Sequence, residues 1–306
     1  MQFLQNSLPY ILAGISVGGQ YALIAIGYTM VYGIVKLINF AHGDVMMVGA
    51  YTGYFVLVFF GTTPFGLFMA FLAAMIVCAL LSLLIERCAY RPLRNSPRLN
   101  SLITAIAVEL ILQNLMRVLP FVGPDPRSYP VMPSVTHRLV TPSFPDGLVS
   151  ISDIQILVIV SSIILMILLN LLINYTRTGK AMRAVSYDMG AASLMGISVN
   201  KTIAITFVIG SVLAGAGGVL YATAYPQIDP TMGYIPGLKA FVAAVLGGIG
   251  SVPGAMVGGI ILGIAETMAK AYISSQYADA ISYCILIVIL LIKPSGLLGK
   301  KQVVKV

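Results

Sequence analysis

Two stretches of twenty residues without a charged side chain, 66–85 and 154–173, set the strongest limit on how this chain can fold. About 20 apolar residues in a helix cross a bilayer, and such a helix satisfies its own backbone hydrogen bonds where no water is present. The strands of a membrane barrel would instead give short, alternating segments. The sequence therefore predicts an all-α protein that crosses a membrane several times.

The composition agrees with this fold class. Hydrophobic residues make up 58% of the 306 residues and charged residues only 9%, where roughly 25% charged residues is ordinary for a soluble protein. The net charge of +8 is concentrated in loops, so no nucleic-acid partner is expected. Residues 39–44 contain one His and one Asp, which are too few ligands for a metal site, so no bound metal is expected.

Nine apolar segments are predicted to be spans: 9–30, 44–60, 65–85, 101–119, 154–174, 202–222, 238–250, 254–271 and 279–293. The seventh segment is short. Together with the eighth it forms either two crossings or a re-entrant hairpin, which gives about eight or nine transmembrane helices. No stretch outside the spans is long enough to bury a core of its own, so residues 1–306 form a single transmembrane domain.

Lysine and arginine follow the first, third and fifth segments and end the chain, whereas the opposite loops carry mainly aspartate. Cytoplasmic loops are enriched in Lys and Arg, which predicts nine crossings with the N-terminus outside and the C-terminus in the cytoplasm. Two loops are long. The external loop 121–153 contains six prolines and is expected to be ordered but non-helical, and the cytoplasmic loop 175–200 is expected to form short helices.

Several polar side chains in or near the spans are candidates for a translocation path or gate. Gln20 and Tyr21 lie in the first predicted span, and Asn39, His42 and Asp44 follow it. One interpretation of residues 39–44 is a polar helix start, because a helix N-terminus favours an anion such as Asp44. The other interpretation is a polar network beside a gate.

Glu109 and Glu266 lie inside predicted spans, where a carboxylate marks a functional hypothesis by default. Glu266 precedes Lys270 by four residues, which predicts an ion pair within one helix. Glu109 has no basic neighbour in its own helix, so it is protonated, hydrated or paired with another helix. Asn114 adds another polar group to the same span.

The run GGIGSVPG at 247–254 cannot remain regular helix, because glycine and proline both disfavour it. Irregular backbone at membrane depth is tolerated only inside protein or along a wet cavity. The run is either a tight turn between helices or a flexible element beside the path, and Gly247, Gly248 and Gly250 are the candidates.

The cytoplasmic loop leads to a resemblance. Residues 188–197 read DMGAASLMGI and resemble the Glu-Ala-Ala-xxx-Gly loop by which permeases of bacterial ABC importers contact their ATPases. Ala191, Ala192 and Gly196 match, and Gly190 stands in place of the glutamate. Four longer stretches are similar to the LivH-type permeases of branched-chain amino acid ABC importers: 21–33 (YALIAIGYTMVYG), 37–44 (LINFAHGD), 177–184 (RTGKAMRA) and 239–255 (KAFVAAVLGGIGSVPGA).

The resemblance implies an importer permease that forms half of a translocation pathway in a bacterial inner membrane. It implies a second related permease, two ATP-binding subunits that hold ATP and magnesium, and an extracytoplasmic amino-acid-binding protein. The implied ATPase-coupling residues are Arg177, Gly179, Lys180, Arg183, Asp188, Ala191, Ala192 and Gly196. No enzymatic activity or cofactor is expected in this chain, which has no GxxxxGK[ST] run.

Two alternative functions remain open. Related permeases of the same family carry urea or short amides. A stand-alone secondary transporter would use Glu109, Glu266 or His42 for ion coupling.

Overall fold

A computed structural model of the chain describes residues 2–35, 39–94, 96–131, 133–141 and 144–299. Seven helices are long and apolar enough to cross a membrane, judged by length and composition. They are contained in α1 (Gln2–Val35), α2 (His42–Phe60), α3 (Pro64–Ile85), α4 (Arg98–Val118), α5 (Asp153–Tyr175), α8 (Val199–Ala224) and α10 (Val252–Tyr272). Two apolar helices are shorter, α9 (Tyr234–Gly247) and α11 (Ala278–Ile292). These helices confirm the predicted all-α polytopic fold.

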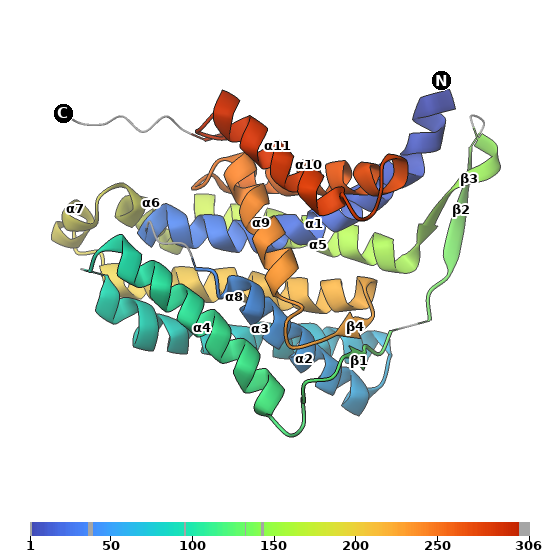
Figure 1. Ribbon diagram of the computed structural model, residues 1–306. Coiled ribbons are helices and arrows are strands. Elements are labelled where there is room, and N and C mark those ends of the chain that lie inside the picture. The colour runs from blue at the N-terminus through green and yellow to red at the C-terminus, as the bar shows by residue number, and fades with distance from the viewer. Residues whose placement is uncertain (1, 36–38, 95, 132, 142–143, 300–306) are drawn as a thin grey trace.

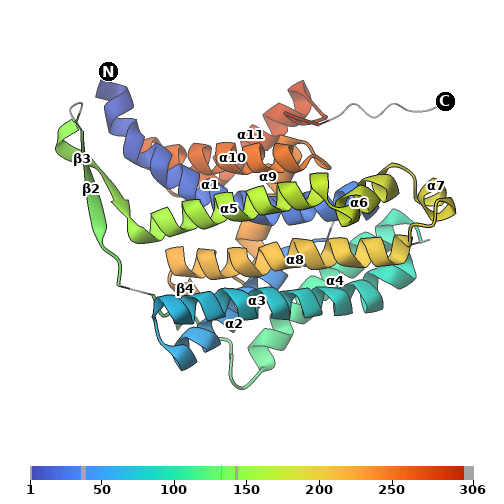
Figure 2. The ribbon, with the colours of Figure 1, turned by 180° about the vertical axis from the view of Figure 1, so that it is seen from behind.

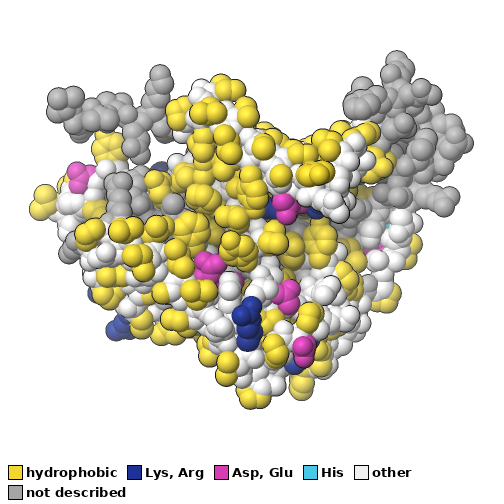
Figure 3. All heavy atoms as spheres, in the orientation of Figure 1, with side chains coloured by type: hydrophobic (Ala, Val, Ile, Leu, Met, Phe, Trp, Pro, Cys, Tyr) yellow, Lys and Arg dark blue, Asp and Glu magenta, His cyan; other side chains and the backbone are white. Residues whose placement is uncertain are grey.

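Helix α1 forms the centre of the bundle, packed against α5, α8, α9 and α10 (Figures 1 and 2). Nearly all of its side chains from Tyr21 to Val31 are buried. Helices α3 and α5, in contrast, expose many large apolar side chains, as expected for helices in contact with lipid. Figure 3 shows that hydrophobic side chains cover most of the face seen in Figure 1, with isolated charged groups between them.

Helices α2 and α9 begin inside the bundle rather than at its edge. His42, the first residue of α2, lies against Gly27 of α1, about two turns and therefore about 12 Å before α1 ends. Helix α9 has 14 residues and is about 21 Å long, less than the roughly 30 Å of a bilayer core. The two helix starts meet at Gly43 and Gly233, where a Cβ on Gly43 would lie 2.4 Å from the Gly233 carbonyl oxygen.

The boundaries of α9 differ from the predicted segment 238–250. Helix α9 begins at Tyr234 with Pro236 in its first turn, a position where the missing N–H of proline leaves no hydrogen bond unmade. It ends at Gly247, because Gly248 has φ +107°, which a residue with a side chain rarely adopts.

The two long loops lie at opposite ends of the bundle (Figures 1 and 2). At one end, β2 (Thr136–Thr141) and β3 (Phe144–Ser152) form an antiparallel hairpin. At the other end, the loop after α5 forms two short helices, α6 (Arg177–Tyr187) and α7 (Met189–Leu194). At the end of α3 the chain turns through η1 (Glu86–Tyr90) and η2 (Arg91–Leu93) into α4.

A second pair of strands joins segments that are distant in sequence. The short strand β1 (Arg127–Ser128) pairs with β4 (Gln227–Ile228), which precedes α9. Tyr129 follows β1 and is buried beside Gly53 and Tyr54; burial raises the pKa of its phenol, so the hydroxyl stays protonated. Prolines around β1 keep the chain extended, and its backbone groups then pair with another extended segment.

Gly218→Ala is expected to lower the melting temperature in detergent by several degrees, whereas Gly217→Ala leaves it nearly unchanged. A Cβ at position 218 would lie 2.2 Å from the Met46 carbonyl oxygen of α2, but at position 217 the nearest atom is 3.6 Å away on Ile24. Overpacking a tight contact costs about 1–3 kcal/mol. Equal melting temperatures of the two variants would contradict the close packing of α8 on α2.

Candidate functional site

The polar residues predicted at the start of α2 lie together inside the bundle. Tyr90 donates a hydrogen bond to the Asn39 side-chain oxygen at 2.8 Å. The His42 ring lies edge-on to Tyr28 with 5.0 Å between ring centroids. Asp44 is in the first turn of α2, as its sequence position predicted, and only 1% of it is exposed. The segment is a polar helix start whose side chains are buried in the bundle, and its place beside a gate stays a prediction.

Asp44 and Glu109 line one cavity of about 360 Å³ between α2, α4 and the start of α9. Gln113, on α4, donates its amide to both Asp44 carboxylate oxygens, at 3.3 and 3.2 Å. Glu109 is half-buried and lies one turn before Gln113. In the described part of the chain, neither carboxylate forms an ion pair. The remaining lining residues are Tyr28, Phe40, Ile106, Leu110, Gly233, Tyr234 and Leu238.

Tyr21 and Glu266 belong to a different group, an ionic network that joins α1, α9, α10 and α11. Lys270 lies 2.6 Å from Glu266 Oε1, which confirms the predicted pair within one helix. Lys239 adds a second cation, 2.8 Å from the same oxygen and 2.6 Å from Asp279 Oδ1. Tyr21 donates to Glu266 Oε2 at 2.8 Å. This carboxylate is fully paired.

Sequence reasoning missed Lys239, because its partners come from α10 and α11 and no short-range spacing links them. The lone lysine at the edge of an apolar segment was the available signal, since a cation in a span needs a partner.

Gln20 and Asn114 are not brought together with the cavity residues. Gln20 is buried, and neither atom of its amide has a hydrogen-bond partner among the described residues. Asn114 is exposed and donates to the Leu110 carbonyl oxygen of its own helix at 2.7 Å. Nothing in the structure links either side chain to Asp44 or Glu109.

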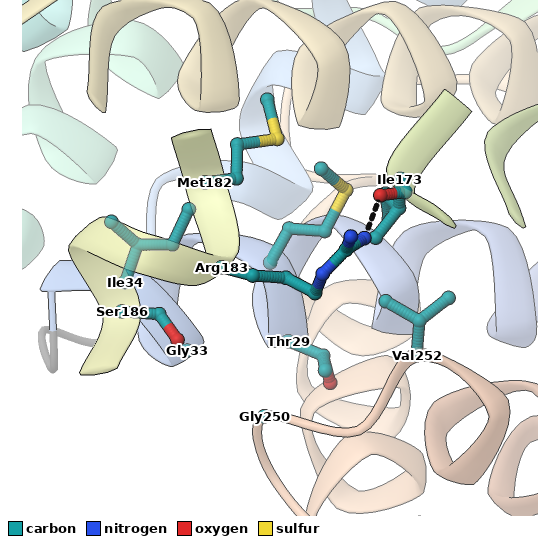
Figure 4. A pocket seen from close by; sticks show the side chains of 10 residues that line it. Thr29, Gly33, Ile34, Ile173, Met182, Arg183, Ser186, Gly250 and Val252 are labelled. Carbon is teal, nitrogen blue, oxygen red and sulfur yellow. Dashed lines mark hydrogen bonds between the residues drawn. The ribbon is translucent and has the colours of Figure 1, made fainter. Parts of the chain in front are cut away.

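The glycine-rich run forms a turn between α9 and α10. Gly248 and Gly250 have φ of +107° and +95°, and Ser251 caps α10 by accepting from the Gly254 N–H at 3.2 Å. Gly250 lies beside a small cavity of about 80 Å³ that Thr29 of α1 and Arg183 of α6 also line (Figure 4). A tight turn is thus present, and its flexibility stays a prediction.

Several of the residues implied in ATPase coupling lie in α6 or at the contact between α6 and α5. Thr176 caps α6 by accepting from the Gly179 N–H at 3.1 Å. Gly179 packs so closely on α5 that a Cβ there would lie 2.0 Å from the Ile173 carbonyl oxygen. Arg183 donates to the same oxygen (Figure 4). Arg177 and Lys180 are on the first turn of the helix, and Lys180 is exposed.

Helix α7 follows directly and projects from the bundle (Figure 2). Asp188 caps it by accepting from the Ala191 N–H at 2.9 Å. Ala192 is its buried residue, and Gly196, with φ +80°, lies just beyond its end.

The most exposed large apolar side chains of α6, α7 and the residue after α7 are Tyr187, Leu194 and Met195. Leu194 is 90% exposed. Sequence reasoning did not select these residues. Apolar side chains within a charged loop were the signal that would have found them, because a loop in water has no internal reason to carry them.

The apolar helices of membrane-spanning length place the chain among multi-pass membrane proteins. The family described as "Branched-chain amino acid transport system / permease component" matches residues 10–290, and the chain belongs to this family. No solved structure matches the chain.

Three relatives illustrate the similarity. The high-affinity branched-chain amino acid transport system permease protein LivH of Salmonella typhimurium is 44% identical over 300 residues, 96% of each chain. The corresponding protein BraD of Pseudomonas aeruginosa is 41% identical over 311 residues, 100% of each chain. A probable branched-chain amino acid transport permease protein LivH of Methanocaldococcus jannaschii is 30% identical over 287 residues, 90% of this chain and 88% of that protein. All three are named as transport components.

Lys239→Met is expected to destabilise the protein much more than Lys270→Met. The side chain of Lys239 is 6% exposed and bridges two carboxylates, whereas that of Lys270 is 42% exposed. Removing one partner of a buried pair costs about 3–5 kcal/mol, and an exposed pair contributes about 0–1 kcal/mol. Thermal unfolding of both variants in detergent measures the difference, and a larger loss for Lys270→Met would contradict the network.

Proposed function

We propose that this chain is the membrane-spanning permease subunit of an ATP-driven importer for branched-chain amino acids, and that it forms half of the translocation pathway. The similarity to relatives of that name over nearly their whole length supports the substrate class. A second, related permease completes the pathway. Two ATP-binding subunits, which hold ATP and magnesium, and an extracytoplasmic amino-acid-binding protein complete the importer.

The exposed apolar surface of α6 and α7, formed by Tyr187, Leu194 and Met195, carries the assignment of an ATPase partner. Exposed apolar groups that gather on one projection mark a protein-interaction site. The caps at Thr176 and Asp188 make this projection stiff, and stiffness is what transmission of movement from an ATPase requires. Helices α6 and α7 therefore supply the coupling element of the importer.

The proposed orientation has α6 and α7 in the cytoplasm and the β2–β3 hairpin outside. Arg94, directly after η2, lies at the α6–α7 end, because it donates to the Asn200 side chain at the start of α8 at 2.5 Å. Basic residues at this end agree with a cytoplasmic location. The N-terminus lies at the hairpin end (Figure 1), which supports a protein of the bacterial cytoplasmic membrane with its N-terminus outside.

Leu194→Asp is expected to abolish co-purification of the ATP-binding subunits and leave membrane insertion intact. The reason is that a carboxylate replaces the most exposed apolar side chain of the α6–α7 projection. The matched control is Val135→Asp, which changes an exposed apolar residue (62%) at the opposite end of the bundle. A pull-down in mild detergent, with the co-purifying chains identified, measures the result. Normal ATPase recovery with Leu194→Asp would overturn the docking assignment.

Uptake of labelled leucine, isoleucine and valine by the assembled importer in liposomes tests the transport function itself. ATP-dependent uptake of these amino acids, and none of urea or short amides, is the expected result. Uptake by this chain alone, driven by a pH gradient and indifferent to ATP, would establish the stand-alone secondary transporter instead.

A further inference from the structure

The cavity between α2, α4 and the start of α9 is lined by two carboxyl groups and, among the described residues, by no basic side chain. Asp44 is 1% exposed and lines this cavity. Among the described residues, the carboxylate oxygens of Asp44 accept hydrogen bonds only from the neutral side-chain amide of Gln113. Glu109 lines the same cavity from α4, and among the described residues no Lys, Arg or His pairs with either group. Buried charges are normally paired, and a cationic group that enters this cavity would meet two carboxyl groups without a basic partner.

The start of α9 packs against the start of α2 and lines the same cavity, where it carries the other polarity. Gly233 and Tyr234, at the start of α9, line it, and a helix N-terminus carries a partial positive charge. The first turn of α9 contains no acidic residue that would neutralise this charge, unlike the first turn of α2, which contains Asp44. The Tyr234 N–H already bonds the Thr231 carbonyl oxygen at 3.0 Å. The start of α9 therefore attracts an anion through the partial positive charge of the helix dipole rather than through the Tyr234 N–H.

The rest of the lining is apolar and aromatic: Phe40, Ile106, Leu110, Leu238 and Tyr28. The volume of about 360 Å³ is within the range of small-ligand sites, which is about 300–1,000 Å³. Tyr234 and Leu110 are more than half exposed, whereas Asp44 and Tyr28 are buried. The cavity is therefore open near α4 and α9 and closed at α2.

We propose that this cavity binds the amino-acid zwitterion during its passage, with the ammonium group on Asp44 and Glu109 and the carboxylate toward the start of α9. The aliphatic side chain contacts Phe40, Leu110 and Leu238. Anionic substrate groups at the N-termini of helices that begin within the membrane are a known arrangement in transporters, and α9 has this geometry. The inference rests on the proposed import of branched-chain amino acids and assigns the polar groups of that cargo to particular residues.

Transport by the complete importer in liposomes tests the site, with loaded binding protein outside and ATP supplied to the ATPase subunits. Asp44→Asn and Glu109→Gln are each expected to reduce leucine uptake about ten-fold or more, which corresponds to about 1.4 kcal/mol at 25 °C. ATP hydrolysis stimulated by the binding protein is expected to stay within about two-fold of wild type. Asp44→Glu, which keeps a carboxylate, recovers part of the uptake, and the control Asp125→Asn, in the loop after α4, leaves it unchanged.

Cysteine labelling gives a direct measure of occupancy. Leu110→Cys places a thiol at the cavity, in a chain whose Cys88 and Cys284 are replaced by serine, since both are exposed and Cys78 is buried. In the assembled importer, leucine is expected to slow the reaction of this thiol with a maleimide. The amine 3-methylbutan-1-amine slows it partly, and 4-methylpentanoate, which lacks the ammonium group, does not. Adding Asp44→Asn removes the protection by leucine.

The outcomes separate this inference from the proposed function. Absence of leucine uptake by the wild-type importer would overturn the proposed function and this site with it. Wild-type uptake that Asp44→Asn and Glu109→Gln both leave unchanged overturns only the site. So does equal protection by leucine and 4-methylpentanoate. If Asp44→Asn fails to fold, Glu109→Gln decides the question, because Glu109 is half-exposed and its loss leaves no buried group unpaired.

Discussion

A backbone inside a bilayer has to find its hydrogen-bond partners within the protein. This constraint matters most at the starts of α2 and α9, because the first N–H groups of a helix have no partner within the helix. The start of α2 is buried, and the start of α9 packs against it, with Tyr234 exposed at the mouth of the cavity. Both starts are tolerated because Gly43 and Gly233 let the two backbones touch and because α1 packs against both helices. The cavity exists at this place for the same reason: two helices that begin here leave a space that a continuous helix would have filled.

Buried charge is handled in two ways in this molecule. In the ionic network, Glu266 meets two lysines and a tyrosine hydroxyl, and the network ties α10 to α1, α9 and α11. Around the cavity, Asp44 meets only an amide and Glu109 remains half-exposed. A paired carboxylate holds helices in place, whereas an unpaired carboxylate at a cavity attracts whatever cation enters. The same residue type therefore serves structure in one half of the bundle and is available for binding in the other.

The sequence predicted the class of fold and, approximately, the number of membrane-spanning helices, because spans of about 20 uncharged residues leave few alternatives. Of the predicted segments, 238–250 and 279–293 correspond to apolar helices shorter than a full span. It also predicted the Glu266–Lys270 pair, which needs only helical spacing. It did not predict Lys239 in the network, the contact of Gln113 with Asp44, or the pairing of β1 with β4. Each of these depends on which helices lie side by side, and no local spacing encodes that. The sequence shows that Leu194 and Met195 are apolar residues in a charged loop. It does not show that they are exposed at the end of a helix that projects from the bundle, and that exposure is what suggests a binding surface.

Helix α9 connects the glycine-rich turn beside α6 with the cavity lined by Asp44 and Glu109. At its C-terminal end, α9 leads into Gly248 and Gly250, beside Arg183 of α6 (Figure 4). Its N-terminal end forms a wall of the cavity. An α-helix barely changes length under load, since every turn is held by its own hydrogen bonds. An axial shift of the glycine turn would therefore be passed along α9 to the cavity wall at its other end, about 21 Å away.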